Sequence, residues 1–312
     1  MRAYLLAFIL ALLSAAPSFA GTPRVVASIK PIHSLVASIM GNTGEPTLLV
    51  SGGASPHTFS LKPSHASALS AADLVFWIGP DLEGFLTNPM ANLVQDGASV
   101  PLMSGEGVTL LEAREGGVWG EHLHHEDHAE GEEEESEHSF DPHIWLNMDN
   151  TIALTKIIES SLSTTYPSLA STFSENADRL RSHLTALDLK LKHQLTPFTA
   201  MPYFVFHDAY QYFEDRYNLT PLGAVSANPD VRPGARRMVE LKEAGQGPMC
   251  VFAEPQFEPR ILHVLMEDEG TKLGYLDPLG SSIPEGPDHF AATLGALATS
   301  ISDCLTAEAN AQ

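Results

Sequence analysis

The feature that most constrains the fold is a regular alternation of short apolar runs with helical patterns along the chain. The strand-like runs lie at 24–28, 47–51, 73–78, 203–207, 220–225, 250–253 and 273–276. Helical patterns lie at 31–40, 63–71, 82–94, 209–217, 233–244, 259–269 and 289–305. Strands that alternate with helices at this spacing predict βαβ units. We therefore expect an α/β fold with two lobes, each a mainly parallel sheet flanked by helices.

A different pattern separates the two halves. From Leu169 to Leu195, apolar side chains recur at steps of three and four residues, and prolines bound the stretch on both sides. This pattern predicts one amphipathic helix over 166–196, which at about 1.5 Å per residue is roughly 40 Å long. We expect it to connect an N-terminal lobe, 21–165, to a C-terminal lobe, 197–312. A helix packed within one larger domain is the alternative.

The first 20 residues, 1–20, have the pattern of a cleavable signal peptide. A positive charge at Arg2 precedes an apolar run too short to span a bilayer, and small residues precede the cleavage point. No cysteine follows that point to carry a lipid anchor. Removing Arg2 changes the formal charge from −22 to −23, which disfavours nucleic acid and anionic lipid as partners. We expect a soluble periplasmic protein without a membrane anchor, and a cation as its ligand.

Within the first half, the stretch 121–138 is rich in carboxylates and nearly devoid of apolar residues. It also holds five of the fourteen histidines: His122, His124, His125, His128 and His138. A segment of this composition cannot bury enough apolar surface to fold alone. We expect an exposed loop that binds metal weakly, either as an accessory site or as a passive buffer.

Three other histidines lie where a strand or a tight turn ends. His57 follows the second strand-like run, His143 lies in an Asp-Pro-His turn, and His207 ends the fourth run. Ligands of open α/β sheets bind outside the carboxyl ends of the strands, and Asp277 ends the last run. We predict that these four side chains meet in a cleft between the lobes. Three imidazoles with a carboxylate or water form an ordinary zinc site.

The chain has two cysteines, Cys250 and Cys304. In an oxidising compartment two thiols of one chain usually pair, and the bridge would join a strand of the second lobe to the last helix. A two-thiolate zinc site is the alternative. We expect the disulfide, because exported proteins rarely keep thiols reduced.

Five short motifs, in order along the chain, carry a resemblance to a known family. They are Gly53-Ala54-Ser55-Pro56-His57, Asp141-Pro142-His143-Ile144-Trp145, Phe206-His207-Asp208-Ala209-Tyr210, Glu254-Pro255-Gln256-Phe257 and Leu276-Asp277-Pro278-Leu279-Gly280. Together they resemble the periplasmic zinc-binding proteins of ATP-binding-cassette importers over essentially the whole mature chain. The resemblance implies two lobes joined by a long helix, with metal ligands at the three histidines and the aspartate named above. The His-rich acidic loop and the cysteine pair also fit the zinc-binding members.

The third ligand bears on the identity of the metal. Manganese- and iron-binding relatives carry a carboxylate where this chain has His207, and imidazole favours zinc over those harder cations, although copper and nickel stay open. Some zinc-binding relatives have an acidic residue before the first histidine, whereas this chain has Pro56. We therefore expect Asp277 or water as the fourth ligand. Because imidazoles bind metal only when neutral, zinc affinity should fall below about pH 6.

The function that the resemblance implies is capture of Zn²⁺ as a transported ligand and its delivery to a membrane-embedded permease. We expect a monomer that is not an enzyme, with Glu254 supporting the site by hydrogen bonds. A zinc buffer, a manganese-binding protein and a secreted zinc hydrolase are the alternatives. The hydrolase is disfavoured because the histidines at 122–128 do not have the metallo-β-lactamase spacing. The remaining histidines are expected to be structural: His33, His65, His183, His193, His263 and His289.

Overall fold

The computed structural model describes residues 22–119, 139–226, 233–245, 249–257, 262, 265–266 and 270–309. Within these ranges the chain forms two four-stranded parallel sheets with helices against them, as predicted. The predicted signal peptide lies outside the described residues. No helix in the described part combines the length and the apolar character that a membrane span requires.

The first sheet has the strand order β2-β1-β3-β4. Its strands are β1 (Val25–Ile29), β2 (Thr47–Val50), β3 (Leu74–Trp77) and β4 (Ser99–Pro101), and all neighbouring pairs are parallel. The helices that connect them are α1 (Lys30–Met40), α2 (Pro63–Ala71) and α3 (Thr87–Leu93). β1 and β3 are buried throughout, which explains why their sequences are continuous apolar runs rather than alternating ones.

The second sheet repeats this plan with the order β6-β5-β7-β8. Its strands are β5 (Tyr203–His207), β6 (Pro221–Ser226), β7 (Cys250–Ala253) and β8 (Lys272–Tyr275), again all parallel. Its helices are α6 (Gln211–Tyr217), α7 (Ala235–Ala244) and α8 (His289–Ala309). Because every strand is parallel, the carboxyl ends of the strands share one edge in each sheet.

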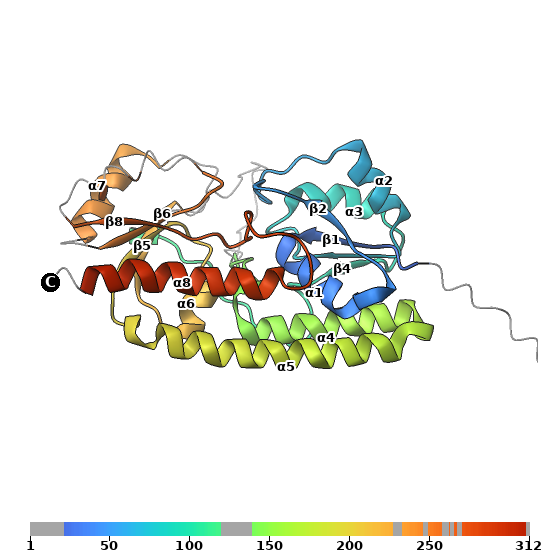
Figure 1. Cartoon of the computed structure of the whole chain (residues 1–312). Helices are drawn as coiled ribbons and strands as arrows, with labels where there is room; N and C mark the ends of the chain where they lie inside the picture. Colours follow the sequence, from blue (N-terminus) through green and yellow to red (C-terminus); the bar gives the residue numbers. More distant parts are fainter. Residues whose placement is uncertain are drawn as a thin grey trace, which may run out of the picture.

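The long helix predicted between the halves is α5 (Ala170–Leu195), preceded by a short 3₁₀ turn, Pro167–Leu169. It packs beside α4 (Met148–Thr165), and Figure 1 shows it running beneath both lobes. It also contacts α1 of the first lobe, and both α6 and α8 of the second. The long helix therefore packs against both lobes.

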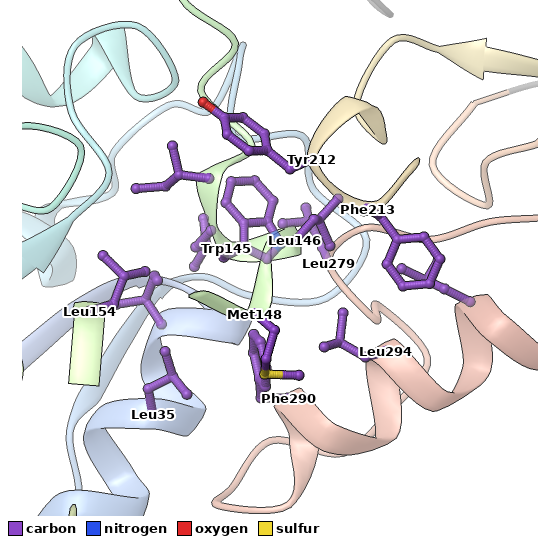
Figure 2. Close-up of a cluster of buried hydrophobic side chains, with 14 of the residues drawn as sticks. Leu35, Trp145, Leu146, Met148, Leu154, Tyr212, Phe213, Leu279, Phe290 and Leu294 are labelled. Atoms are coloured by element: carbon purple, nitrogen blue, oxygen red, sulfur yellow. The ribbon is translucent and has the colours of Figure 1, made fainter. Parts of the chain in front are cut away.

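Between the lobes the core is continuous. The largest cluster of buried apolar side chains includes residues from both sheets, from α5 and from α8. Figure 2 shows part of this cluster, with Trp145, Leu146 and Leu279 close together above Phe290 and Leu294 of α8. The indole nitrogen of Trp145 donates to the carbonyl of Pro278 at 2.9 Å. This packing fixes how the carboxyl edges of the two sheets face each other.

The predicted disulfide is present. Cys250 at the start of β7 bonds to Cys304 near the end of α8, across 54 residues of sequence. A crosslink of this span restricts the unfolded chain and stabilises a fold by about 2–4 kcal/mol. It ties the last helix, which also contacts α1 and α5, to the second sheet.

One stretch that we assigned to the first lobe from its sequence lies against the second. The 3₁₀ turn Gly117–Trp119 contacts β6, and Arg237 donates to the backbone carbonyl of Val118. No side chain fits at Gly223, because a Cβ there would lie 2.2 Å from the same carbonyl oxygen. The segment leading into the His-rich loop therefore bridges the two lobes.

Candidate metal centre

Three histidines from distant parts of the chain meet at one point between the two sheets. His57 lies in the loop after β2, His143 precedes the 3₁₀ turn Ile144–Leu146, and His207 ends β5. One ring nitrogen of each lies within 4.8 Å of those of the other two. Nitrogen ligands of a tetrahedral zinc ion are about 3.4 Å apart, so small inward movements of the rings would complete coordination.

The ring of His143 is held by the carboxylate two residues before it. Nδ1 lies 2.7 Å from Oδ1 of Asp141, and the same oxygen accepts the backbone N–H of His143 at 2.9 Å. Both side chains are buried. A carboxylate at Nδ1 favours the proton there and leaves the Nε2 lone pair to face a metal, an arrangement common behind zinc-binding histidines.

His207 lies near a carboxylate that follows the neighbouring strand. Its Nδ1 lies 3.3 Å from Oε1 of Glu254, the residue after β7, and both side chains are buried. The same oxygen accepts the hydroxyl of Tyr210 at 3.1 Å. Glu254 is thus close to His207, and its supporting role by hydrogen bonds stays a prediction.

Asp277, predicted as a fourth ligand, is not part of this group of converging donor atoms. Its Oδ1 accepts the side-chain amide of Gln256 at 2.7 Å and the backbone N–H of Leu279 at 3.1 Å. Its Oδ2 accepts both the backbone N–H and the hydroxyl of Ser281 at 2.6 Å. Both oxygens of Asp277 are thus engaged in hydrogen bonds, and the turn after it carries the Pro278 carbonyl that accepts the indole N–H of Trp145.

A polar cavity of about 210 Å³ opens beside the three imidazoles. Four charged residues line it, namely Asp81, Arg114, Asp141 and Asp208, and so does Phe140. A much smaller pocket, of about 20 Å³, lies against the imidazoles and is bounded by Trp145 among others. A further ligand could therefore reach the three imidazoles most readily from the larger cavity, which has room for several waters.

Arg114 bridges the lobes at the cavity wall. Its guanidinium bonds to Asp208 and, at 2.8 Å, to Glu214, and it stacks on Trp119 with the ring centroid 3.6 Å away. Burial raises the pKa of Glu214 to about 7 and also raises that of Asp208, while the positive charge of Arg114 opposes both shifts. One cation thus balances two buried acids beside His207.

The five loop histidines predicted as a weak metal site, from His122 to His138, lie outside the described residues. The chain some residues before the loop pairs with the chain directly after it, with Ala113 donating its backbone N–H to the carbonyl of Ser139 at 2.8 Å and Asp141 donating to that of Leu111 at 2.9 Å. Ala113 and Ser139 both line the cavity. Ser139, the first described residue after the loop, therefore lies at the cavity beside the three imidazoles.

Other histidines in the described part of the chain are not in the converging group. His33 bonds to the carbonyl of Pro46 and His289 to that of Leu279, both at 2.9 Å, and His65 accepts the backbone N–H of Lys62. Sequence reasoning missed the roles of Asp141, Asp208 and Arg114. Asp141 could have been found from its place two residues before His143, where an Asx turn forms.

The sequence matches the family model for the zinc-uptake complex component A, periplasmic, over residues 25–304. The high-affinity zinc uptake system protein ZnuA of Brucella suis biovar 1 is 37% identical over 305 residues, which cover 90% of this chain and 91% of that protein. The protein of the same name from Yersinia pestis is 33% identical over 307 residues, covering 95% of each.

Solved structures share the fold. A crystal structure of ZnuA superposes with a TM-score of 0.73 at 23% identity, covering 90% of this chain and 98% of that one. FpvC from Pseudomonas aeruginosa, solved in complex with Mn²⁺, superposes with a TM-score of 0.74 at 19% identity, covering 94% and 100%. The family match over most of the chain, together with the Brucella and Yersinia identities, shows that this chain belongs to the family of periplasmic A components of zinc-uptake complexes.

Proposed function

We propose that this protein captures Zn²⁺ with His57, His143 and His207 and delivers it to the permease of an ATP-binding-cassette importer. The observation that carries the proposal is the convergence of one nitrogen from each of three histidines that are far apart in sequence. The relatives named above are high-affinity zinc uptake proteins. Membership of an uptake family also confirms the prediction that the chain is a binding protein rather than an enzyme.

The donor atoms, rather than the fold, support zinc as the metal. The Mn²⁺ complex of FpvC has the same fold, so the architecture alone does not select the ion. In the described part of this chain the converging group consists of imidazoles and contains no carboxylate. Imidazole suits Zn²⁺, whereas Mn²⁺ prefers oxygen ligands. We propose water from the polar cavity as the fourth ligand, because Asp277 is engaged in its own turn.

The family and the predicted signal peptide both support a location in the periplasm. The family is periplasmic. We propose that residues 1–20 direct export and are removed, that the mature protein works as a monomer without its own membrane anchor, and that its partner is the membrane-embedded permease. Release of the ion to that partner exchanges metal ligands and makes or breaks no covalent bond.

Deleting the His-rich loop tests whether the three histidines are the transport site. A chain lacking 121–138 is expected to keep one tight zinc site per molecule, because the three imidazoles lie outside the deletion and a backbone hydrogen bond joins Ala113, before the deletion, to Ser139, after it. Competition titration against a zinc chelator measures this. The intact chain is the control and should show additional weak binding. Loss of all tight binding in the deletion variant would indicate that the transport site lies in the loop instead.

A further inference from the structure

One carboxylate on the cavity wall has no role in the site described so far. Asp81 follows β3, at the same carboxyl edge of the first sheet from which His57 and its loop emerge after β2. It lines the same cavity as the three imidazoles. Its oxygens are not members of the donor group that lies within 4.8 Å, so in this conformation it does not complete the first coordination shell.

The turn that carries Asp81 is well anchored. Gly79 donates its backbone N–H to the carboxylate of Glu83 at 3.0 Å and accepts the backbone N–H groups of Leu82 and Glu83. Glu83 and Leu82 are buried, and the φ of Gly79 is +148°, which favours glycine. Asp81 thus lies at the tip of a turn whose base is fixed in the core, with its side chain partly exposed at the cavity.

The other charged groups on this wall are already engaged. Arg114 forms an ion pair with Asp208, and Asp141 is hydrogen-bonded to His143. Within the described part of the chain, no hydrogen bond or ion pair engages the carboxylate of Asp81. Partial burial raises its pKa, and no nearby cation opposes that shift. The cavity volume of about 210 Å³ corresponds to about seven waters at roughly 30 Å³ each, which is enough for a hydrated metal ion.

We propose that Asp81 is a capture carboxylate, which accepts hydrogen bonds from the water shell of an incoming Zn²⁺ before the three imidazoles displace those waters. The proposal rests on the function proposed above. In this sequence of events the ion enters the cavity hydrated, and nitrogens of His57, His143 and His207 replace waters one by one. Asp81 stays outside the first shell and acts through a bound water, so it sets the rate of capture rather than the lifetime of the bound state.

The test compares Asp81→Asn with Asp96→Asn in the full mature chain. Both changes remove one negative charge from the first lobe, but Asp96 is exposed in the turn before β4, at the opposite, amino-terminal edge of the sheet. Trp145, whose ring centroid lies 5.3 Å from that of His143, provides a fluorescence signal for stopped-flow mixing with Zn²⁺. Dissociation is measured separately by chelator chase.

We expect Asp81→Asn to slow zinc association by roughly threefold or more at low ionic strength, with a smaller effect at high salt and an unchanged dissociation rate. Asp96→Asn should leave both rates close to those of the unaltered chain. Equal association rates in both variants would overturn the proposal. So would faster dissociation of Asp81→Asn with normal association, because that would make Asp81 a ligand of the bound ion. If the unaltered chain binds no zinc, the proposed function itself fails, which is a separate outcome.

Discussion

Replacing His207 with alanine is expected to weaken zinc binding at least about 100-fold. Structural zinc sites with four ligands contribute about 10–16 kcal/mol, so one ligand accounts for about 3 kcal/mol, and 1.4 kcal/mol is tenfold in affinity. His207 is buried at the end of β5 and its nitrogen belongs to the converging group. No other described side chain is placed to substitute for it. Competition titration of the mature chain against a chelator measures the loss.

Two further variants make this test specific. Glu254→Gln keeps the metal ligand but removes the charge 3.3 Å from Nδ1 of His207, and a loss of about 10–100-fold is expected, as is typical for partners behind a metal-binding histidine. His193→Ala changes an exposed histidine on α5 and should leave affinity unchanged. A His207→Ala variant that binds zinc as tightly as His193→Ala would contradict the assignment of His207 as a ligand.

Replacing Arg114 with methionine is expected to lower the free energy of unfolding by about 3–5 kcal/mol near pH 8. Removing one partner of a buried ion pair leaves the opposite charge buried and uncompensated, which is the costly part of the change. Here two acids lose their cation at once, because Asp208 and Glu214 are each 3% exposed and both bond to Arg114. Urea unfolding, followed by circular dichroism, gives the value.

The destabilisation by Arg114→Met should also depend on pH. Burial already raises the pKa of Glu214 to about 7, and loss of the cation raises it further. Protonation of Glu214 therefore favours the folded variant. The loss in free energy of unfolding, relative to the unaltered chain, should shrink as the pH falls from about 8 to about 5. Arg236→Met removes an arginine that is 94% exposed and serves as the control, with a much smaller loss. A loss in free energy of unfolding as small as that of the control would show that the ion pairs of Arg114 with Asp208 and Glu214 do not stabilise the fold.

Much of the architecture could be predicted because buried parallel strands have continuous apolar sequences. The strands β1, β3, β5 and β7 are such runs, and the leucine spacing over α5 is that of a helix with one buried face. The strand β4 was missed because it has only three residues, is only partly buried and ends in proline at the edge of its sheet.

The helix α4 was also missed, although its start has a recognisable signal. Its interior is rich in serine and threonine, which weakens helical patterning. The side chain of Asn147 accepts the backbone N–H groups of Asp149 and Asn150, which is the geometry of an N-cap. Asn147 directly after the Ile-Trp-Leu run could therefore have identified the helix.

The site shows a similar division between what the sequence determines locally and what only packing determines. His57, His143 and His207 were predicted because each lies at the end of a strand or in a tight turn. The role of Arg114 could not be predicted, because its partners are about 100 residues away and no local pattern joins them. For Asp277, the position at a strand end predicted a ligand, and the structure shows both of its oxygens engaged by hydrogen bonds from its own turn and from Gln256, which local sequence did not indicate.

The measurement that tests the central claim most directly compares the mature chain with the combined His57→Ala, His143→Ala and His207→Ala variant, both with the loop 121–138 intact. Each is purified without added metal and dialysed against a weak chelator before its zinc content is measured. We expect one zinc per molecule in the unaltered chain and none in the variant. Equal zinc content in the two proteins would contradict the assignment of the three histidines as the zinc ligands.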